Sequence, residues 1–153
     1  MAIRRDQSPS EQVNAQVRRC MAVLPRQGET SPFRRLQQRM ESGWYADLIS
    51  DLTGEFAVVE TTDLNTDRAR VVFLSRGIEQ YNLALSLWGP FASVYSSGGS
   101  PQYLDVDELC VGLRRVLEGH AVELVKPGAI DATMRDADGT SRTVWEVMFC
   151  SGH

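Results

Sequence analysis

His120 is the one internal histidine of the sequence, and it is the first residue to consider for chemistry. Paired with Cys110 or Cys150, it would supply the general base that a thiol nucleophile requires. Both cysteines lie among apolar residues, and neither has neighbours that would favour its thiolate form. We therefore favour the interpretation that His120 ends a helix, close to the negative pole of the helix dipole.

Asp63, Asn65 and Asp67 have the spacing with which a calcium-binding loop begins. The match then fails, because Arg68 stands where such a loop needs glycine and Leu74 where it needs glutamate. The same polar residues are typical of a hairpin turn, and we assign them to one. We predict no catalytic residue, no metal site and no cofactor site from the sequence.

The glycine-rich segment at 97–101 is a second candidate for chemistry. It lacks the GxSxG spacing of a nucleophile elbow, and it lacks the GK[ST] ending of a phosphate-binding loop. Both motifs also require a helix directly after the loop, and the sequence predicts none there. We interpret the segment as a connector.

Aromatic and acidic residues gather around the turn near 89 and the start of the helix predicted at 105–118. Aromatic residues at the end of a sheet are typical anchors of protein interfaces, and an acidic rim suits a basic partner. The alternative is that the rings close the open end of the core and the carboxylates cap a helix. The candidate partner-binding residues are Trp88, Phe91, Tyr95, Tyr103, Asp105, Asp107 and Glu108.

The chain of 153 residues has an ordinary globular composition and a formal net charge of −4. Residues 1–40 hold eight arginines against three acidic residues, a net +5, and residues 41–153 hold eight basic against 17 acidic residues, a net −9. The three cysteines form no CxxC pair, and no apolar run approaches the roughly 20 residues that would span a bilayer. We expect a cytoplasmic protein without a secretory signal or a membrane segment.

Two helices with strong start signals open the chain. Ser8 is the predicted N-cap of the first, with Pro9 in its first turn and Glu11 completing a capping box. A second helix begins at Pro32, and its apolar pattern resumes after Gly43 and continues to Gly54. We describe 8–53 as the helical part and 1–7 as a flexible arm.

The segment at 55–150 is predicted to form a sheet with one covering helix. Runs at 55–62 and 68–75 are rich in β-branched residues, and the residues at 79–88 alternate between apolar and polar, which predicts a strand with one buried face. A fourth strand follows the Gly89–Pro90 turn, and an apolar helical stripe at 105–118 predicts the covering helix. Runs at 130–135 and 143–150 around Gly139 predict a last hairpin.

We therefore predict a single α+β domain over 1–153. An N-terminal helical pair precedes an antiparallel sheet of about six strands covered by one helix, in the order α-α-β-β-β-β-α-β-β.

We predict that the protein binds a protein partner, and we favour this function over that of an enzyme. The leading interpretation is a small acidic inhibitor of the immunity-protein type, which binds and blocks a basic partner. One alternative is a secretion-type chaperone or adaptor. Such proteins form dimers, so a homodimer is a further alternative. Another is an enzyme or ligand-binding domain, for which a deep pocket holding His120 with a carboxylate would count. Nucleic-acid binding ranks last, because the −9 segment would repel phosphate.

Overall fold

The computed structural model describes residues 8–25, 32–62, 68–96, 102–135 and 139–149 of the chain. The predicted arm at 1–7, the turn at 63–67, the connector at 97–101, the turn residues 136–138 and Cys150 lie outside these residues.

Three helices open the described chain: α1 (Pro9–Val23), α2 (Pro32–Glu41) and α3 (Ala46–Leu52). The predicted start of α1 is confirmed, because the Ser8 hydroxyl accepts a hydrogen bond from the Glu11 backbone N–H. The buried Gln16 amide fixes α1 on the edge of the sheet. Its nitrogen donates to the Leu124 carbonyl at 2.8 Å, and its oxygen accepts from the Lys126 N–H at 2.7 Å.

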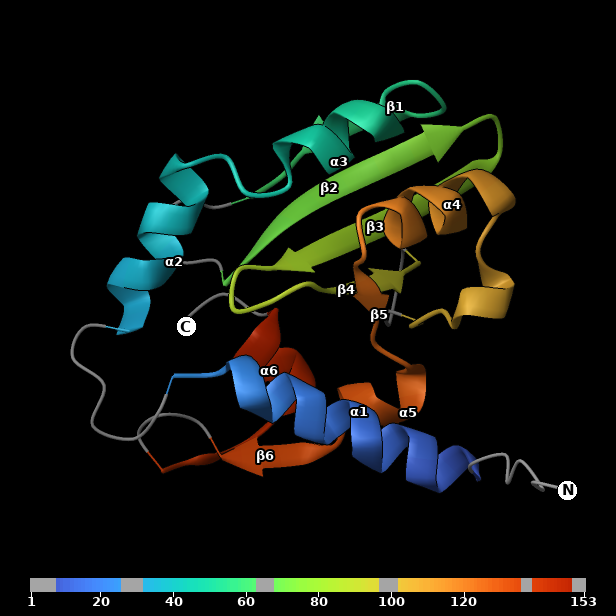
Figure 1. The fold of residues 1–153 in the computed structure, drawn as a ribbon. Coiled ribbons are helices and arrows are strands. Elements are labelled where there is room, and N and C mark those ends of the chain that lie inside the picture. Colours follow the sequence, from blue (N-terminus) through green and yellow to red (C-terminus); the bar gives the residue numbers. More distant parts are fainter. Residues whose placement is uncertain (1–7, 26–31, 63–67, 97–101, 136–138, 150–153) are drawn as a thin grey trace, which may run out of the picture.

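The predicted antiparallel meander is confirmed (Figure 1). Its strands are β1 (Ala57–Glu60), β2 (Ala69–Arg76), β3 (Glu79–Ser86) and β4 (Phe91–Tyr95). In the register, Leu83 lies opposite Val72 on one side and Val94 on the other, so apolar residues meet across the strands. A short fifth strand, β5 (Glu123–Leu124), pairs with β4 in parallel.

Two hydrophobic cores form on opposite faces of this sheet, because successive side chains of a strand point to opposite sides. Figure 1 shows α3 and α4 (Val111–Gly119) over one face, and α1, α5 (Pro127–Ile130) and α6 (Val144–Met148) grouped at the β4–β5 end. The first core includes these buried residues: Leu48, Leu52, Val72, Leu74, Leu83, Leu85, Val94, Leu113 and Leu117. The second core includes Cys20, Leu36, Ala84, Leu87, Trp88, Phe91, Ile130, Val144 and Met148.

The α+β class is confirmed, but the predicted sheet and its cover differ in detail. The sheet of the described chain has five strands, and a separate hairpin forms from β6 (Thr133–Arg135) and β7 (Ser141–Thr143). One helix was predicted to cover the sheet, but two helices, α3 and α4, pack on the same face. Helices α5 and α6 were not predicted.

The strand predicted at 143–150 is wrong where the structure describes it, because Val144–Met148 is the helix α6. Thr143 and Glu146 form a capping box at its start. Val147 and Met148 then lie three and four residues after Val144, and all three are buried on one helical face.

The helix predicted at 105–118 is divided in two. The predicted capping box of Asp105 and Glu108 is confirmed, but it caps the start of the short 3-10 turn η1 (Val106–Glu108) and not that of the long helix. The extended backbone of Leu109 brings its side chain into the first core, and α4 begins after Cys110.

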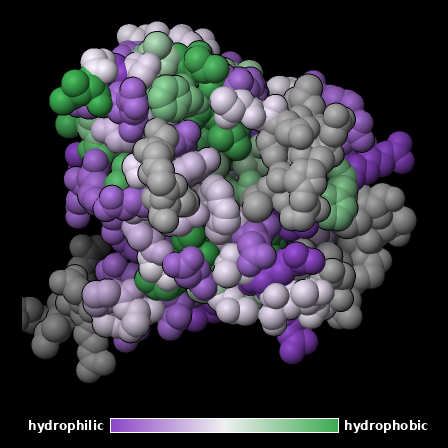
Figure 2. All heavy atoms as spheres, turned by 180° about the vertical axis from the view of Figure 1, so that it is seen from behind, coloured by the Kyte–Doolittle hydropathy of each residue, from purple (hydrophilic) through white to green (hydrophobic). Residues whose placement is uncertain are grey.

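The rear face of the molecule mixes hydrophilic and hydrophobic groups, with hydrophobic groups near its upper edge (Figure 2). The large apolar side chains that are exposed include Val59 in β1 and Ile78 in the turn between β2 and β3. Single exposed apolar residues are normal on protein surfaces, so they define no site. Among the described residues, no helix has both the length and the apolar character needed to cross a membrane.

Candidate functional site

Trp88 and Phe91, two predicted partner-binding residues, are buried in the second core and are 3% and 4% exposed. The Trp88 indole nitrogen donates to the Val147 carbonyl of α6 at 3.1 Å. Both rings therefore fill the core, as the alternative interpretation expects. A partner would reach them only after the surrounding helices moved.

Tyr95 and Tyr103, two further predicted residues, are brought together by an isolated antiparallel bridge. Their ring centroids lie 5.9 Å apart, and Trp145 of α6 lies 5.3 and 5.4 Å from them. All three rings are half-buried. The sequence did not predict that Trp145 joins this cluster, because the residue was assigned to a strand.

The predicted acidic residues Asp105, Asp107 and Glu108 stay together at η1. Asp105 accepts from the Val106 N–H at 2.7 Å and lies 3.7 Å from the Lys126 ammonium. Glu108 accepts from the Asp105 N–H at 3.0 Å, while both Asp107 and Glu108 are exposed. Two of the three carboxylates thus serve the local turn.

The described cysteines do not form a nucleophile–base pair with His120. Cys110 and His120 flank the two ends of α4, about 15 Å apart by the rise of a helix. Cys20 is fully buried, and burial together with the Glu123 carboxylate raises the pKa of its thiol to about 12. The Cys20 thiolate is therefore scarce at neutral pH.

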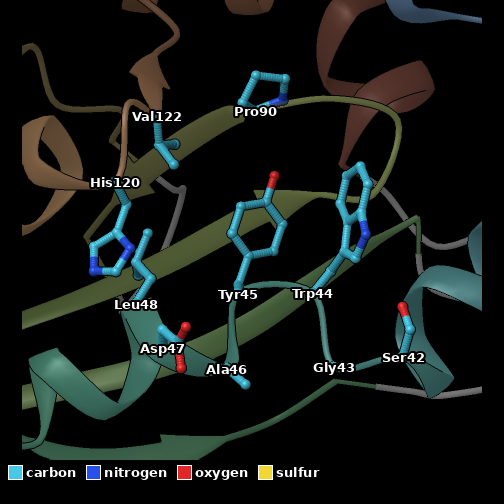
Figure 3. A pocket seen from close by; sticks show the side chains of 10 residues that line it. All are labelled: Ser42, Gly43, Trp44, Tyr45, Ala46, Asp47, Leu48, Pro90, His120 and Val122. Atoms are coloured by element: carbon cyan, nitrogen blue, oxygen red, sulfur yellow. The ribbon is translucent and has the colours of Figure 1, made fainter.

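A cleft of about 620 Å³ opens beside α3, between that helix and the segment that joins α4 to β5 (Figure 3). Figure 3 shows His120 and Val122 on one side, Trp44 and Ser42 on the other, and the Tyr45 ring between them. The full lining is Ser42, Gly43, Trp44, Tyr45, Ala46, Asp47, Leu48, Pro90, His120 and Val122.

The turn before α3 positions the aromatic part of this cleft. Gly43 and Tyr45 both have left-handed backbones, with φ of +79° and +71°. Glycine adopts this conformation freely, but a tyrosine there is uncommon. The Tyr45 hydroxyl lies 2.5 and 2.8 Å from the Ser86 and Gly89 carbonyl oxygens and shares its one hydrogen between them, which holds the ring in place. Burial raises the pKa of the Tyr45 phenol, so the hydroxyl keeps its proton.

Two arginines hold Trp44 at its end of the cleft. The Arg39 guanidinium lies 4.0 Å from the centre of the Trp44 ring, and it donates to the Leu87 carbonyl at 2.6 Å. Arg70 donates to the Trp44 carbonyl at 2.8 Å while it pairs with Glu60. The Trp44 backbone and ring are therefore fixed from two directions.

His120 stands at the opposite side of the cleft, bonded to Asp51 of α3. Its Nε2 lies 2.6 Å from Asp51 Oδ2. An ionised carboxylate can only accept, so Nε2 carries the hydrogen, and Nδ1 of the neutral ring is left as an acceptor. Figure 3 shows one ring nitrogen directed toward Leu48 and Tyr45.

The end of α4 fixes the backbone that carries His120. The Ala121 N–H donates to the Glu118 carbonyl at 3.0 Å, and the Val122 N–H donates to the Leu117 carbonyl at 2.9 Å. These two bonds make a Schellman motif with Ala121 in the left-handed conformation, at φ +54°.

Sequence analysis identified His120 but missed its carboxylate partner and the rest of the cleft. One signal was readable: Asp47 and Asp51 are four residues apart, which places both on one face of a helix. Within the described ranges, no three His, Cys, Asp or Glu side chains are grouped so that they could hold a metal ion.

Comparison of the chain with family models, with curated proteins and with solved structures finds no match.

Proposed function

We propose that this protein binds an organic ligand in the cleft beside α3. The observation that carries the proposal is the composition of one cavity. A partly apolar hollow of about 620 Å³ brings together two aromatic residues and a histidine that a carboxylate orients. Ligand sites of this kind are typically concave, apolar in most of their lining and supplied with a few convergent polar groups.

The backbone around the cleft supports the proposal. Tyr45 and Ala121 are the two residues other than glycine that have positive φ in the described part of the chain. Tyr45 lines the cleft, and Ala121 lies between His120 and Val122, which line it from the other side. Such backbone conformations cost free energy and gather at functional sites.

The arrangement favours binding over nucleophilic catalysis. The Tyr45 hydroxyl is committed to two backbone carbonyls. The Ser42 hydroxyl donates to the Arg39 carbonyl at 3.1 Å, and Figure 3 shows Ser42 at the far end of the cleft from His120. A catalytic pair would require a nucleophile within hydrogen-bond reach of the imidazole, and both of these hydroxyls are bonded to backbone carbonyls instead.

A thermal-shift screen of a diverse small-molecule collection tests this proposal. Ala46 is an exposed lining residue, so Ala46→Phe fills the cleft without removing a hydrogen-bonding side chain. Ala22→Phe makes the same change on the exposed side of α1. We expect compounds that raise the midpoint of the wild type and of Ala22→Phe, but not that of Ala46→Phe. A screen in which every hit acts equally on Ala46→Phe contradicts the proposal.

A second candidate function is the binding of a basic protein partner by an acidic inhibitor. The observation that favours it is the exposure of Asp107 and Glu108 on η1. A pull-down with the wild type and with Asp107→Ala tests it, with Ser10→Ala on the exposed side of α1 as control. A stoichiometric partner lost in Asp107→Ala supports this function, and equal capture by both variants contradicts it.

The chaperone alternative and its homodimer remain predictions. Cytoplasmic localisation also remains a proposal, and the free thiols of Cys20 and Cys110 support a reducing compartment.

A further inference from the structure

Two carboxylates of α3 lie at or beside the cleft, and the His120 imidazole at the end of α4 contacts one of them. Asp47 lines the cleft, and Asp51 lies one helical turn later with its carboxylate on His120. Residues four apart on a helix are neighbours on its surface, so the two acids face the same region. We propose that the ligand group is a protonated amine or guanidinium on an apolar stem. This inference rests on the proposed ligand-binding function.

The polar groups of the cleft suit a cationic donor. The Asp47 carboxylate offers two acceptor oxygens, and His120 Nδ1 offers another acceptor when the ring is neutral. An ammonium carries three donors and a guanidinium five, and neither carries an acceptor. Hydrogen bonds in which one partner is ionised are stronger than neutral ones. A cation held between Asp47 and His120 would thus match both sides of the cleft.

The apolar groups of the cleft suit the stem of such a ligand. Leu48, Val122 and Pro90 line it together with the ring of Tyr45. Long amine side chains bury their methylene stems along apolar surface while the charged head stays near polar groups. Aromatic faces also attract cations that lie over them.

The two arginines that contact Trp44 do not make the cleft a site for anions. Arg39 donates to the Leu87 and Trp88 carbonyls at 2.6 and 2.9 Å. Arg70 is paired with Glu60 at 2.8 Å. Neither arginine is among the residues that line the cleft, whereas Asp47 is. An anionic group would therefore meet a carboxylate of its own sign, which costs free energy.

Three probes that share a ring and differ in charge test the proposal: benzylamine, benzyl alcohol and benzoate. Each is titrated into the ¹⁵N-labelled wild type, and dissociation constants are taken from the amide shifts of the cleft residues. We expect benzylamine to bind most tightly and benzyl alcohol to bind up to about fivefold more weakly, because an exposed ion pair is worth up to about that factor. We expect benzoate to bind most weakly.

Variants assign the charge effect to the cleft. Asp47→Asn removes a charge at nearly constant shape, and Asp131→Asn makes the same change at the exposed end of α5. We expect Asp47→Asn to raise the dissociation constant of benzylamine by about twofold to fivefold and to leave that of benzyl alcohol unchanged. Asp131→Asn should leave both dissociation constants unchanged. Thermal midpoints of the two variants verify that both remain folded.

A further arm distinguishes the source of the cation. N-acetyl-lysine N-methylamide represents a lysine side chain of a protein, and benzylamine represents a free amine. Tighter binding of the lysine derivative supports a protein lysine as the ligand, and tighter binding of benzylamine supports a small amine.

Three results would overturn the inference. If benzyl alcohol or benzoate binds the cleft as tightly as benzylamine, the cation assignment fails while the proposed ligand-binding function stands. If no probe binds, or if Asp47→Asn leaves benzylamine unaffected, the cation assignment also fails. The Ala46→Phe screen then decides independently whether the cleft binds any ligand.

Discussion

His120 Nε2 lies 2.6 Å from Asp51 Oδ2, and this contact joins the end of α4 to α3 at the edge of the cleft. Both helices are fixed on the same face of the sheet, α3 by Leu48 and Leu52 and α4 by Leu113 and Leu117. The hydrophobic core therefore brings the imidazole and the carboxylate together, and the carboxylate sets which ring nitrogen carries the hydrogen.

The first prediction concerns the tautomer of His120. In the wild type, long-range ¹H–¹⁵N spectra of the neutral ring should show the hydrogen on Nε2, because Asp51 accepts from that atom. Asp51→Ala removes the acceptor and should shift the spectrum toward a mixture of the two tautomers. Asp47→Ala, one turn earlier on α3, should leave the spectrum unchanged. Equal spectra for the wild type and Asp51→Ala would contradict the assigned contact.

The second prediction concerns Ala121, the left-handed residue of the Schellman motif after α4. Glycine adopts this conformation without the steric cost that a Cβ brings. Ala121→Gly should therefore raise the free energy of unfolding by up to about 1 kcal/mol, measured by urea denaturation. The control is Ala15→Gly in the middle of α1, which should destabilise by about 1 kcal/mol. Equal destabilisation by both changes would show that Ala121 bears no strain.

The third prediction concerns Gly89, where the turn between β3 and β4 meets the end of α1. A Cβ at this position would lie 2.8 to 2.9 Å from the Cβ and both Cγ atoms of Val23. Gly89→Ala should destabilise the protein by about 1–3 kcal/mol. Gly119→Ala, whose Cβ meets no atom within 4 Å, should be neutral or stabilising.

A double-mutant cycle assigns the Gly89 effect to Val23. In the Val23→Ala background, Gly89→Ala should cost clearly less than in the wild type, because the clashing methyl groups are gone. An undiminished cost would place the effect of Gly89 elsewhere.

The fourth prediction is a pH dependence of stability from Glu123. Burial raises the pKa of its carboxyl, but hydrogen bonds from Arg19 and Gln16 outweigh burial and hold it below the usual 4.5. The carboxylate therefore contributes stability that is fully present above pH 4.5 and is lost as the pH falls through the lowered pKa. Glu123→Gln removes this titration.

Thermal midpoints between pH 6 and pH 3 test the assignment of this pH dependence to Glu123. At pH 6 the thermal midpoint of the wild type should be higher than that of Glu123→Gln, and this difference should shrink below about pH 4. The other carboxylates titrate in both proteins, so their effects largely cancel. A difference that stays constant down to pH 3 would contradict the role given to Glu123.

The meander could be predicted from the sequence because its residues alternate over a long run. Tyr81, Leu83 and Leu85 recur with a period of two and form the buried face of β3. The α6 segment could not be assigned in this way, since five residues fit either period. The better signal there was the spacing of Thr143 and Glu146, which is the same kind of capping box that was recognised at Asp105 and Glu108.

The candidate site was largely beyond the reach of sequence analysis. His120 and Tyr45 lie far apart in the chain, and the sheet with its two helices brings them to one cleft. The apolar pattern at 44–52 suggested a continuous helix from Trp44 onward. The left-handed backbone of Tyr45 instead delays the helix to Ala46 and turns the ring into the cleft. Only tertiary contacts, such as the Tyr45 hydroxyl on Gly89, select that conformation.

The measurement that tests the central claim most directly is amide shift mapping with benzylamine on the assigned wild-type protein. The account predicts that the largest shifts fall on residues 43–48 and 120–122, which line or flank the cleft, and that they vanish in Ala46→Phe. Shifts that cluster at η1 or on the outer face of β1, and that persist in Ala46→Phe, would contradict the account.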